Sequence, residues 1–344
     1  MTMPETPRSL GYRMPAEWEK HDATWVSWPK DPATFPAAIL PKVEAAYVKM
    51  VEALAGGEEV RVLVDDGKAE ARVSGMLRRA ERVAFHRIKT VDVWTRDYLA
   101  TCVRGRDVAL VKWEFNAWGN KYEDLLPDDG AGRAVAEASG LRVFNPGVVL
   151  EGGSIDSDGE GTILTTEQCL LNPNRNPRLG RAGLDRVLAD NLGAEKVVWL
   201  KSGIEGDDTD GHVDDIARFV APGTVAVASE GDAGDPNREA LEADARLLEA
   251  GRDAKGRPLK VVRIPMPPRA DGPDGRLPAS HLNFYIGNRG VLVPTFGGES
   301  DRAALRSVGE AFPTREVVGI DCRALVYGLG TIHCVTQQVP AAHR

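Results

Sequence analysis

The chain has no long apolar run, few cysteines and no excess of positive charge, and each lack excludes a class of protein. No stretch approaches the ~18 uninterrupted apolar residues of a membrane helix, and the N-terminal end lacks the apolar core of a secretory signal. The cysteines, Cys102, Cys169, Cys322 and Cys334, form no CxxC pair, so neither a disulfide framework nor a thiolate metal site is expected. We therefore expect a cytoplasmic protein with reduced thiols.

The net charge of −8 argues against nucleic acid as a partner, because phosphate binding requires clustered lysine and arginine. An acidic surface is compatible with a cationic substrate, which it attracts. Two common hydrolase motifs are also missing, namely the G-x-S-x-G of serine hydrolases and the H-E-x-x-H of zinc peptidases. An active site in this chain would therefore use other residues.

Short predicted helices and strands alternate along the whole chain, as judged by 3.6-residue apolar periods and by β-branched runs. The predicted helices are 36–55, 69–82, 184–191, 237–248 and 301–311, and the predicted strands are 60–64, 107–113, 196–200, 224–228, 260–264, 291–294 and 316–320. The segment 265–278, rich in glycine, proline and aspartate, is expected to be a surface loop. No linker divides the chain, so we expect residues 1–344 to form one domain.

One pattern recurs through the chain: a polar residue, a short apolar strand, a turn and a second strand. The polar residues are Asp97, Glu151, His212, His281 and Cys334, which lie 53 to 69 residues apart. Such a recurrence predicts an array of mixed α/β units around an axis, each directing one polar end at a shared centre. The segment 21–29 is expected to complete the last unit and so to close the ring.

Cys334 follows two glycines near the C-terminus and is either a small buried core residue or a nucleophile. Asp97, three residues after Trp94, is either a surface partner of Arg96 or an anchor for a cation that the indole covers. Glu151 precedes two glycines, and marks either a hairpin corner or a ligand held at a tight turn.

The segment 205–215 holds six acidic residues and His212, which is unusually dense. A calcium loop and a solvated acidic turn are the alternatives to a catalytic segment, although the EF-hand pattern is incomplete. If the segment enters a strand, His212 and Asp214 project from the same face. A neighbouring carboxylate would raise the pKa of the imidazole and keep it available as an acid.

These residue types suit the hydrolysis of a guanidinium group. Its planar fork of donors matches paired carboxylates such as Asp97 and Asp214. Its carbon is a poor electrophile and requires a strong nucleophile, which the thiolate of Cys334 would supply. The departing ammonia requires a proton, for which His212 is the available acid.

With these residues the chain resembles the agmatine deiminases, within the superfamily of guanidino-group-modifying enzymes that includes bacterial peptidylarginine deiminases. The resemblance spans almost the whole chain and rests on ordered motifs at family spacing. They are MPAEWEKHDATWVSWP at 14–29, WTRD at 94–97, FNAWG at 115–119 with KY at 121–122, EGGSI at 151–155, DTDGHVD at 208–214 and IHCVTQQ at 332–338.

The resemblance implies an α/β fold, a five-bladed α/β propeller of ββαβ modules of the pentein type. It implies that Cys334 is the nucleophile, forming a covalent thiouronium, and that His212 protonates the leaving ammonia and then activates water. Asp97 and Asp214 would bind the guanidinium. The same resemblance places Trp94, Glu151 and Asp208 around the substrate.

The resemblance further implies a small cationic guanidine as substrate, no metal or organic cofactor, no membrane partner, homo-oligomers and a role in putrescine biosynthesis. Two positions depart from the family pattern: Tyr98-Leu-Ala follows Asp97, and Leu329 stands where the family has glycine. A deiminase of another guanidine, such as free or peptidyl arginine, therefore stays open. An amidinotransferase, and a binding protein on the same scaffold, are the further alternatives.

Overall fold

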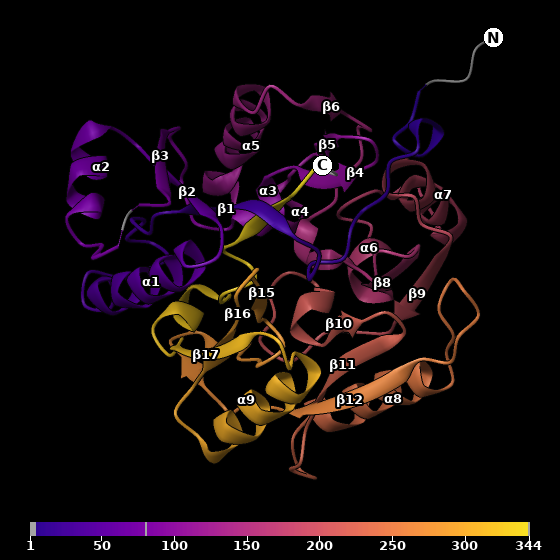
Figure 1. Cartoon of the computed structure of the whole chain (residues 1–344). Helices are drawn as coiled ribbons and strands as arrows, with labels where there is room; N and C mark the ends of the chain where they lie inside the picture. The colour runs from indigo at the N-terminus through magenta and orange to yellow at the C-terminus, as the bar shows by residue number, and fades with distance from the viewer. Residues whose placement is uncertain (1–4, 80, 343–344) are drawn as a thin grey trace.

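The computed structural model describes residues 5–79 and 81–342, which form a mixed α/β fold. Within those residues the strands make five sheets of three or four strands and one two-stranded hairpin. Each of the five sheets contains an antiparallel pair, followed by a helical crossover to a strand that joins in parallel. Figure 1 shows these sheets around the middle of the molecule, with the longer helices on the outside.

The five units follow one another along the chain. The first comprises β1 (His21–Ser27), α1 (Leu40–Ala55), β2 (Glu59–Val64), α2 (Gly67–Ser74) and β3 (Val83–Arg87), and the second β4 (Thr101–Arg104), β5 (Val108–Val111), α5 (Pro127–Ala138) and β6 (Arg142–Phe144). The third comprises β7 (Asp156–Ser157), β8 (Thr162–Thr166), α6 (Glu167–Leu170), α7 (Arg181–Leu192) and β9 (Lys196–Leu200). The fourth comprises β10 (Ala217–Ala221), β11 (Thr224–Ser229), α8 (Asn237–Glu249) and β12 (Lys260–Pro265), and the fifth β15 (Tyr285–Ile286), β16 (Gly290–Thr295), α9 (Glu299–Ala311) and β17 (Glu316–Asp321).

The two ends of the chain meet in one sheet. The last strand, β18 (Gln337–Pro340), pairs antiparallel with β1, and β1 pairs in parallel with β2. The predicted pairing of the segment 21–29 with the C-terminal unit is thereby confirmed. The expected surface loop at 265–278 is also confirmed, and it carries the small hairpin of β13 (Asp271–Gly272) and β14 (Gly275–Arg276).

All predicted strands occur, with ends within two residues of those expected. Four predicted helices also occur, but the helix predicted at 69–82 is wrong after residue 74. The side chain of Asp66 accepts hydrogen bonds from the backbone of Lys68 and Ala69 and so begins α2, and Gly75 follows its last residue. Glycine is a poor helix former, which accounts for the early end. Ala80, within the predicted range, lies outside the described residues.

Short helical segments carry residues of four of the motifs, namely α3 (Thr95–Tyr98), α4 (Ala117–Asn120), η3 (Gly152–Ser154) and η4 (Val213–Asp215). The other short segments are η1 (Arg8–Leu10), η2 (Glu123–Leu125) and η5 (Leu325–Gly328). Both α3 and η4 pack against η3. Among the described residues, no helix combines the length and apolar character that spanning a membrane requires.

Helix α5 was not predicted, because its glycines and its N-terminal proline resemble a loop. Gly132 lies where α5 packs against the backbone of Tyr98, because a Cβ at this position would lie 2.1 Å from the carbonyl oxygen of Tyr98. The absence of a side chain therefore lets α5 approach α3, which carries Asp97.

We predict opposite effects for two glycine substitutions in α5. Gly132→Ala should lower the free energy of unfolding by about 1–3 kcal/mol, because the new methyl group overlaps the Tyr98 carbonyl. Gly130→Ala, whose Cβ would meet no atom within 4 Å, should raise stability by up to ~1 kcal/mol or leave it unchanged. Urea denaturation of both variants measures this difference, and equal effects would contradict the packing of α5 on α3.

Candidate active site

A cavity of about 810 Å³ reaches from the surface to the sulfur-bearing residue Cys334. Asp97, Trp94 and Trp118 line it near that residue, and Asp208 lines it as well. Further lining residues come from the loop that carries β13 and β14. The cavity thus joins several units of the fold around one thiol.

Cys334 lies in the turn between η5 and β18 and is only 8% exposed. The side-chain amide of Asn283 donates a hydrogen bond to its sulfur at 3.1 Å, and the Asp214 carboxylate lies 3.7 Å from that sulfur. Burial raises the pKa of the Cys334 thiol well above its ordinary value, and the charges of Asp214, Asp215 and Asp97 add to the rise. A cation bound beside these carboxylates would offset their charge and favour the thiolate.

Asp97, His212 and Asp214 converge on Gly153. A Cβ at Gly153 would lie 2.5 Å from His212 Nδ1, 3.0 Å from Asp97 Oδ1 and 3.1 Å from Asp214 Oδ2. The backbone N–H of Gly153 donates to Asp97 Oδ1 at 2.9 Å, and Trp118 Nε1 donates to Asp97 Oδ2 at 3.0 Å. Only glycine leaves room for these three side chains to approach one another.

The local structures expected around these residues are partly wrong. Val213 to Asp215 form the 3-10 helix η4, and the strand begins only at Ala217, so His212 and Asp214 do not share a strand face. Asp207 explains the difference, because its carboxylate accepts hydrogen bonds from the backbone of Thr209 and His212 and holds the segment as a loop. Asp97 lies on the helical turn α3, which precedes the strand β4, so the expected order of a polar residue and then a strand holds here.

Burial disfavours the charged forms of both the Asp97 carboxylate and the His212 imidazole. It raises the pKa of Asp97 to about 6, although the charge of His212 acts in the opposite direction. Burial also lowers the pKa of His212, but the charges of Asp97 and Glu151 and the neighbouring Cys169 together raise it well above its ordinary value. The His212 Nδ1 atom lies 3.9 Å from Asp97 Oδ1, and the Nε2 atom lies 4.0 Å from Glu151 Oε2. The imidazole of His212 therefore binds its second proton more tightly than a free histidine does.

His333, which was not among the predicted site residues, supports Asp214. Its Nδ1 atom lies 2.7 Å from Asp214 Oδ2, and its Nε2 atom lies 2.8 Å from Glu17 Oε2. Glu17 is also 3.0 Å from Arg218. Burial raises the pKa of Asp214, but the hydrogen bond with His333 and the charges of His333, His212 and Arg218 together lower it on balance. The alternation of acidic and basic groups keeps Asp214 ionised beside the thiol.

His281 is not part of this centre, contrary to the recurring pattern. Its ring bonds to the carbonyl of Pro265 and to Asp301, whereas Asn283, two residues later, contacts Cys334. The Asn283 side-chain oxygen also accepts hydrogen bonds from Thr331 and from the backbone of His333. The residue that contacts Cys334 is therefore Asn283 and not the expected His281. The turn before β15 determines which of the two faces the thiol, and the spacing of residues in the sequence does not reveal that turn.

The remaining predicted residues lie around the cavity or behind it. Trp94 lines the cavity and donates from Nε1 to Asp92 at 2.9 Å. Asp208 lines the cavity and accepts a hydrogen bond of 2.6 Å from Tyr122, and burial raises the pKa of Asp208 to about 6. Glu151 does not line the cavity; it is fully buried and pairs with Arg175 at 2.9 Å.

Comparison with known proteins relates the chain to deiminases of guanidine compounds. A family model described as Porphyromonas-type peptidyl-arginine deiminase matches residues 13–340. The agmatine deiminase of Stutzerimonas stutzeri (strain A1501) is 40% identical and is aligned over 99% of this chain and 98% of its own length. The solved agmatine deiminase of Enterococcus faecalis is 34% identical, with a TM-score of 0.92 and 99% of each chain covered.

A solved cysteine-to-serine variant of the agmatine deiminase of C. jejuni, with substrate bound, is 27% identical, with a TM-score of 0.87 and 97% of each chain covered. An amidinotransferase from Microseira wollei, at 14% identity and a TM-score of 0.55, shares the fold alone. The mixed α/β fold therefore has its neighbours in the pentein superfamily.

We predict that the carboxylate of Asp214 suppresses ionisation of the neighbouring thiol. Asp214→Asn should lower the pKa of Cys334, so that neutral iodoacetamide alkylates Cys334 faster than in the unaltered protein at the same pH below that pKa. Asp208→Asn is the matched control, because Asp208 lines the same cavity but is not among the main causes of the raised pKa of Cys334. Peptide mass spectrometry after timed alkylation measures the rate.

Cys334→Ala gives the background, since the other three cysteines are buried. An unchanged or slower alkylation rate in the Asp214→Asn protein would contradict the electrostatic role of Asp214.

Proposed function

Because this chain belongs to the family of Porphyromonas-type peptidyl-arginine deiminases, we propose that it is an agmatine deiminase. The reaction is the hydrolysis of agmatine to N-carbamoylputrescine and ammonia, a step toward putrescine. The observation that carries the proposal is the convergence of Asp97, His212 and Asp214 on Gly153, at the end of an acidic cavity where Cys334 lies. A thiol, an imidazole and two carboxylates in one buried space are the groups that attack on a guanidinium carbon requires.

In the first step, Asp97 and Asp214 accept hydrogen bonds from the guanidinium nitrogens. The bound positive charge offsets the carboxylates that raise the pKa of Cys334, so the thiol loses its proton to solvent. The Cys334 thiolate then attacks the guanidinium carbon and forms a C–S bond. The protonated imidazole of His212 gives its proton to one nitrogen, which leaves as ammonia, and a thiouronium stays on Cys334.

In the second step, the neutral His212 removes a proton from a water molecule that attacks the thiouronium carbon. The C–O bond forms and the C–S bond breaks, and the second proton of the water passes to the departing Cys334 sulfur, so the neutral ureido product is released and the thiol is restored. Each cycle consumes one water and releases one ammonia, and His212 returns to its protonated form. The chemistry uses side chains alone, without a metal or an organic cofactor.

The charges around the cavity favour agmatine over arginine. Asp208, Glu205 and Asp274 are among the lining acids and suit the free amine of agmatine. Arginine carries an additional carboxylate, which would require a free cation. Among the lining residues that the structure describes, Lys121 is paired with Asp210 at 2.7 Å and Arg276 with Asp235 at 2.8 Å.

Of the two departures from the family pattern, only Leu329 changes the lining of the cavity. Leu329 lines the cavity, with its backbone in the left-handed region at a φ of +70°. A leucine side chain there narrows the space and favours a slim, unbranched substrate over an arginine within a peptide. Tyr98 does not line the cavity; it is buried and its hydroxyl donates to the carbonyl of Asp92. The change at 98–100 therefore leaves the substrate's surroundings unaltered.

We also infer that the five units close into a five-bladed propeller and that residues 1–344 act as one catalytic domain. The pairing of β1 with β18 supports closure, because it ties the first unit to the last strand. A cytoplasmic location is part of the proposal, because a nucleophilic thiol and unpaired cysteines require a reducing compartment. Assembly into homo-oligomers, and the absence of nucleic acid as a partner, stay predictions.

Ammonia release tests the reaction and the substrate together. The purified protein should release ammonia from agmatine, and Cys334→Ala should reduce the rate roughly a thousandfold or more, because no other group supplies the nucleophile. Free arginine and a peptidyl arginine are tested as alternative substrates in the same assay. Release from either of these but not from agmatine would overturn the substrate while leaving the mechanism intact; transfer of the amidino group to an added amine would indicate an amidinotransferase.

We predict that Asp208 binds the substrate's amine. Asp208→Asn should raise KM for agmatine about tenfold or more and change kcat little, since a hydrogen bond to a charged group contributes about 1.5–3 kcal/mol. Because the pKa of Asp208 is about 6, KM in the unaltered enzyme should rise as pH falls below 6 and Asp208 takes up a proton. This pH dependence should flatten in the variant.

The matched control is Asp124→Asn, which removes an exposed carboxylate from the same cavity. Steady-state kinetics measures KM and kcat of both variants between about pH 5 and 8, the range in which Asp208 is expected to titrate. Equal effects of the two substitutions would contradict a specific contact of Asp208 with the amine.

A further inference from the structure

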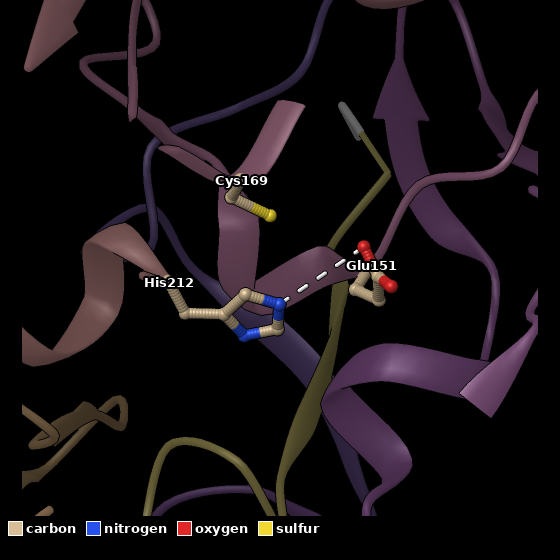
Figure 2. Close-up of side chains that lie close together, drawn as sticks. All are labelled: Glu151, Cys169 and His212. Atoms are coloured by element: carbon tan, nitrogen blue, oxygen red, sulfur yellow. Dashed lines mark ion pairs between the residues drawn. The ribbon is translucent and has the colours of Figure 1, made fainter. Parts of the chain in front are cut away.

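Behind the catalytic centre, three potential metal ligands from three short segments meet. The carboxylate of Glu151, the sulfur of Cys169 and a ring nitrogen of His212 each lie within 4.8 Å of the others, and all three residues are buried. Figure 2 shows the sulfur and the carboxylate on the same side of the imidazole, next to its Nε2 atom. None of the three lines the substrate cavity.

Two of these ligand atoms lack hydrogen-bond partners. Glu151 Oε2 and His212 Nε2 are buried and have no partner among the described residues, whereas Glu151 Oε1 accepts from Arg175 at 2.9 Å. Unpaired buried polar atoms are costly, and a native structure that contains them usually has a use for them. Here both atoms face one small space, and the thiol of Cys169 borders it.

The donor set matches the preference of a borderline-soft divalent cation. Imidazole nitrogen, thiolate sulfur and carboxylate oxygen are the common ligands of Zn²⁺, and three protein ligands leave a fourth position open. The 4.0 Å between His212 Nε2 and Glu151 Oε2 is slightly longer than the roughly 3.3–3.6 Å that separates two ligands of a tetrahedral zinc ion. A small shift of side chains would close the difference.

Charge balance also permits a cation. With His212 protonated, Cys169 as a thiol and Glu151 ionised, the three groups sum to zero. A divalent cation that displaces one proton from His212 and one from Cys169 leaves the sum at zero. The nearby guanidinium of Arg175 is already paired with Glu151 and with Asp210.

We propose that Glu151, Cys169 and His212 form an inhibitory site for a thiophilic divalent cation of the Zn²⁺ type. The ion takes the Nε2 lone pair of His212 and replaces the ring's second proton. The imidazolium that protonates the leaving ammonia is then no longer available, so catalysis stops. The inhibition rests on the proposed function, whereas binding of the ion does not.

Cobalt spectroscopy tests binding without an activity assay. Co²⁺ serves as the probe, because a thiolate bound to it absorbs in the near ultraviolet. The Cys334→Ala protein, which lacks the nucleophile, should show this absorption on titration with Co²⁺. The additional substitution Cys169→Ser should abolish it, and Cys102→Ser, which removes a buried thiol outside the site, should leave it unchanged.

Glu151→Gln in the same Cys334→Ala background keeps the sulfur and removes the carboxylate, so the absorption should persist while the affinity for Co²⁺ falls about tenfold or more. Thermal melting of each variant without metal verifies folding. Absence of the absorption in the folded Cys334→Ala protein, or its survival after Cys169→Ser, would overturn the site.

Zn²⁺ should also inhibit ammonia release by the unaltered enzyme, and EDTA should restore it. If the protein releases no ammonia from agmatine while the cobalt absorption depends on Cys169, the proposed function fails and the metal site stands. If activity is present, Zn²⁺ inhibits, and the cobalt absorption requires Cys334 rather than Cys169, the function stands and the site fails.

Discussion

Buried negative charge beside a thiol is the constraint on which the rest of the site depends. Asp97, Asp214 and Glu151 lie in a space from which water is largely excluded, where ionised carboxylates are costly unless paired. Basic groups meet each of them: His212 faces Asp97, His333 bonds to Asp214, and Arg175 pairs with Glu151. Next to Cys334, burial and the charges of Asp214, Asp215 and Asp97 together raise the pKa of the thiol. A guanidinium bound beside these carboxylates would offset their charge.

The fold meets this constraint by bringing the inner ends of its units together. Short helical turns rather than strands present the polar side chains, and glycine at 153 allows three of them to approach within a few ångströms of one point. The N-terminal segment contributes as well, because Glu17 holds His333 from the far side of Asp214. Glu17 and His333, which are 316 positions apart in the chain, therefore both support the Asp214 carboxylate.

The sequence allowed the prediction of seven of the strands and most long helices, because β-branched runs and apolar periods are local signals. Several shorter strands, such as β4 and β8, were not predicted. It did not predict α5, since the glycine that permits close packing against Tyr98 also resembles a loop signal. It misplaced His212 and Asp214 on a strand, because the backbone hydrogen bonds of Asp207 are not visible in an acidic run. Glu17, Asn283 and His333 were missed as site residues because their roles arise only from contacts across the fold. His281 was assigned to the centre by spacing alone.

The central claim is that Cys334 carries the amidino carbon during turnover. Rapid acid quenching of the enzyme mixed with agmatine, followed by peptide mass spectrometry, tests it most directly. The account predicts a transient adduct on Cys334 whose mass equals agmatine less ammonia, and which rises and decays as N-carbamoylputrescine forms. Product formation with an adduct on another residue, or with Cys334 unmodified at every quench time, would contradict it.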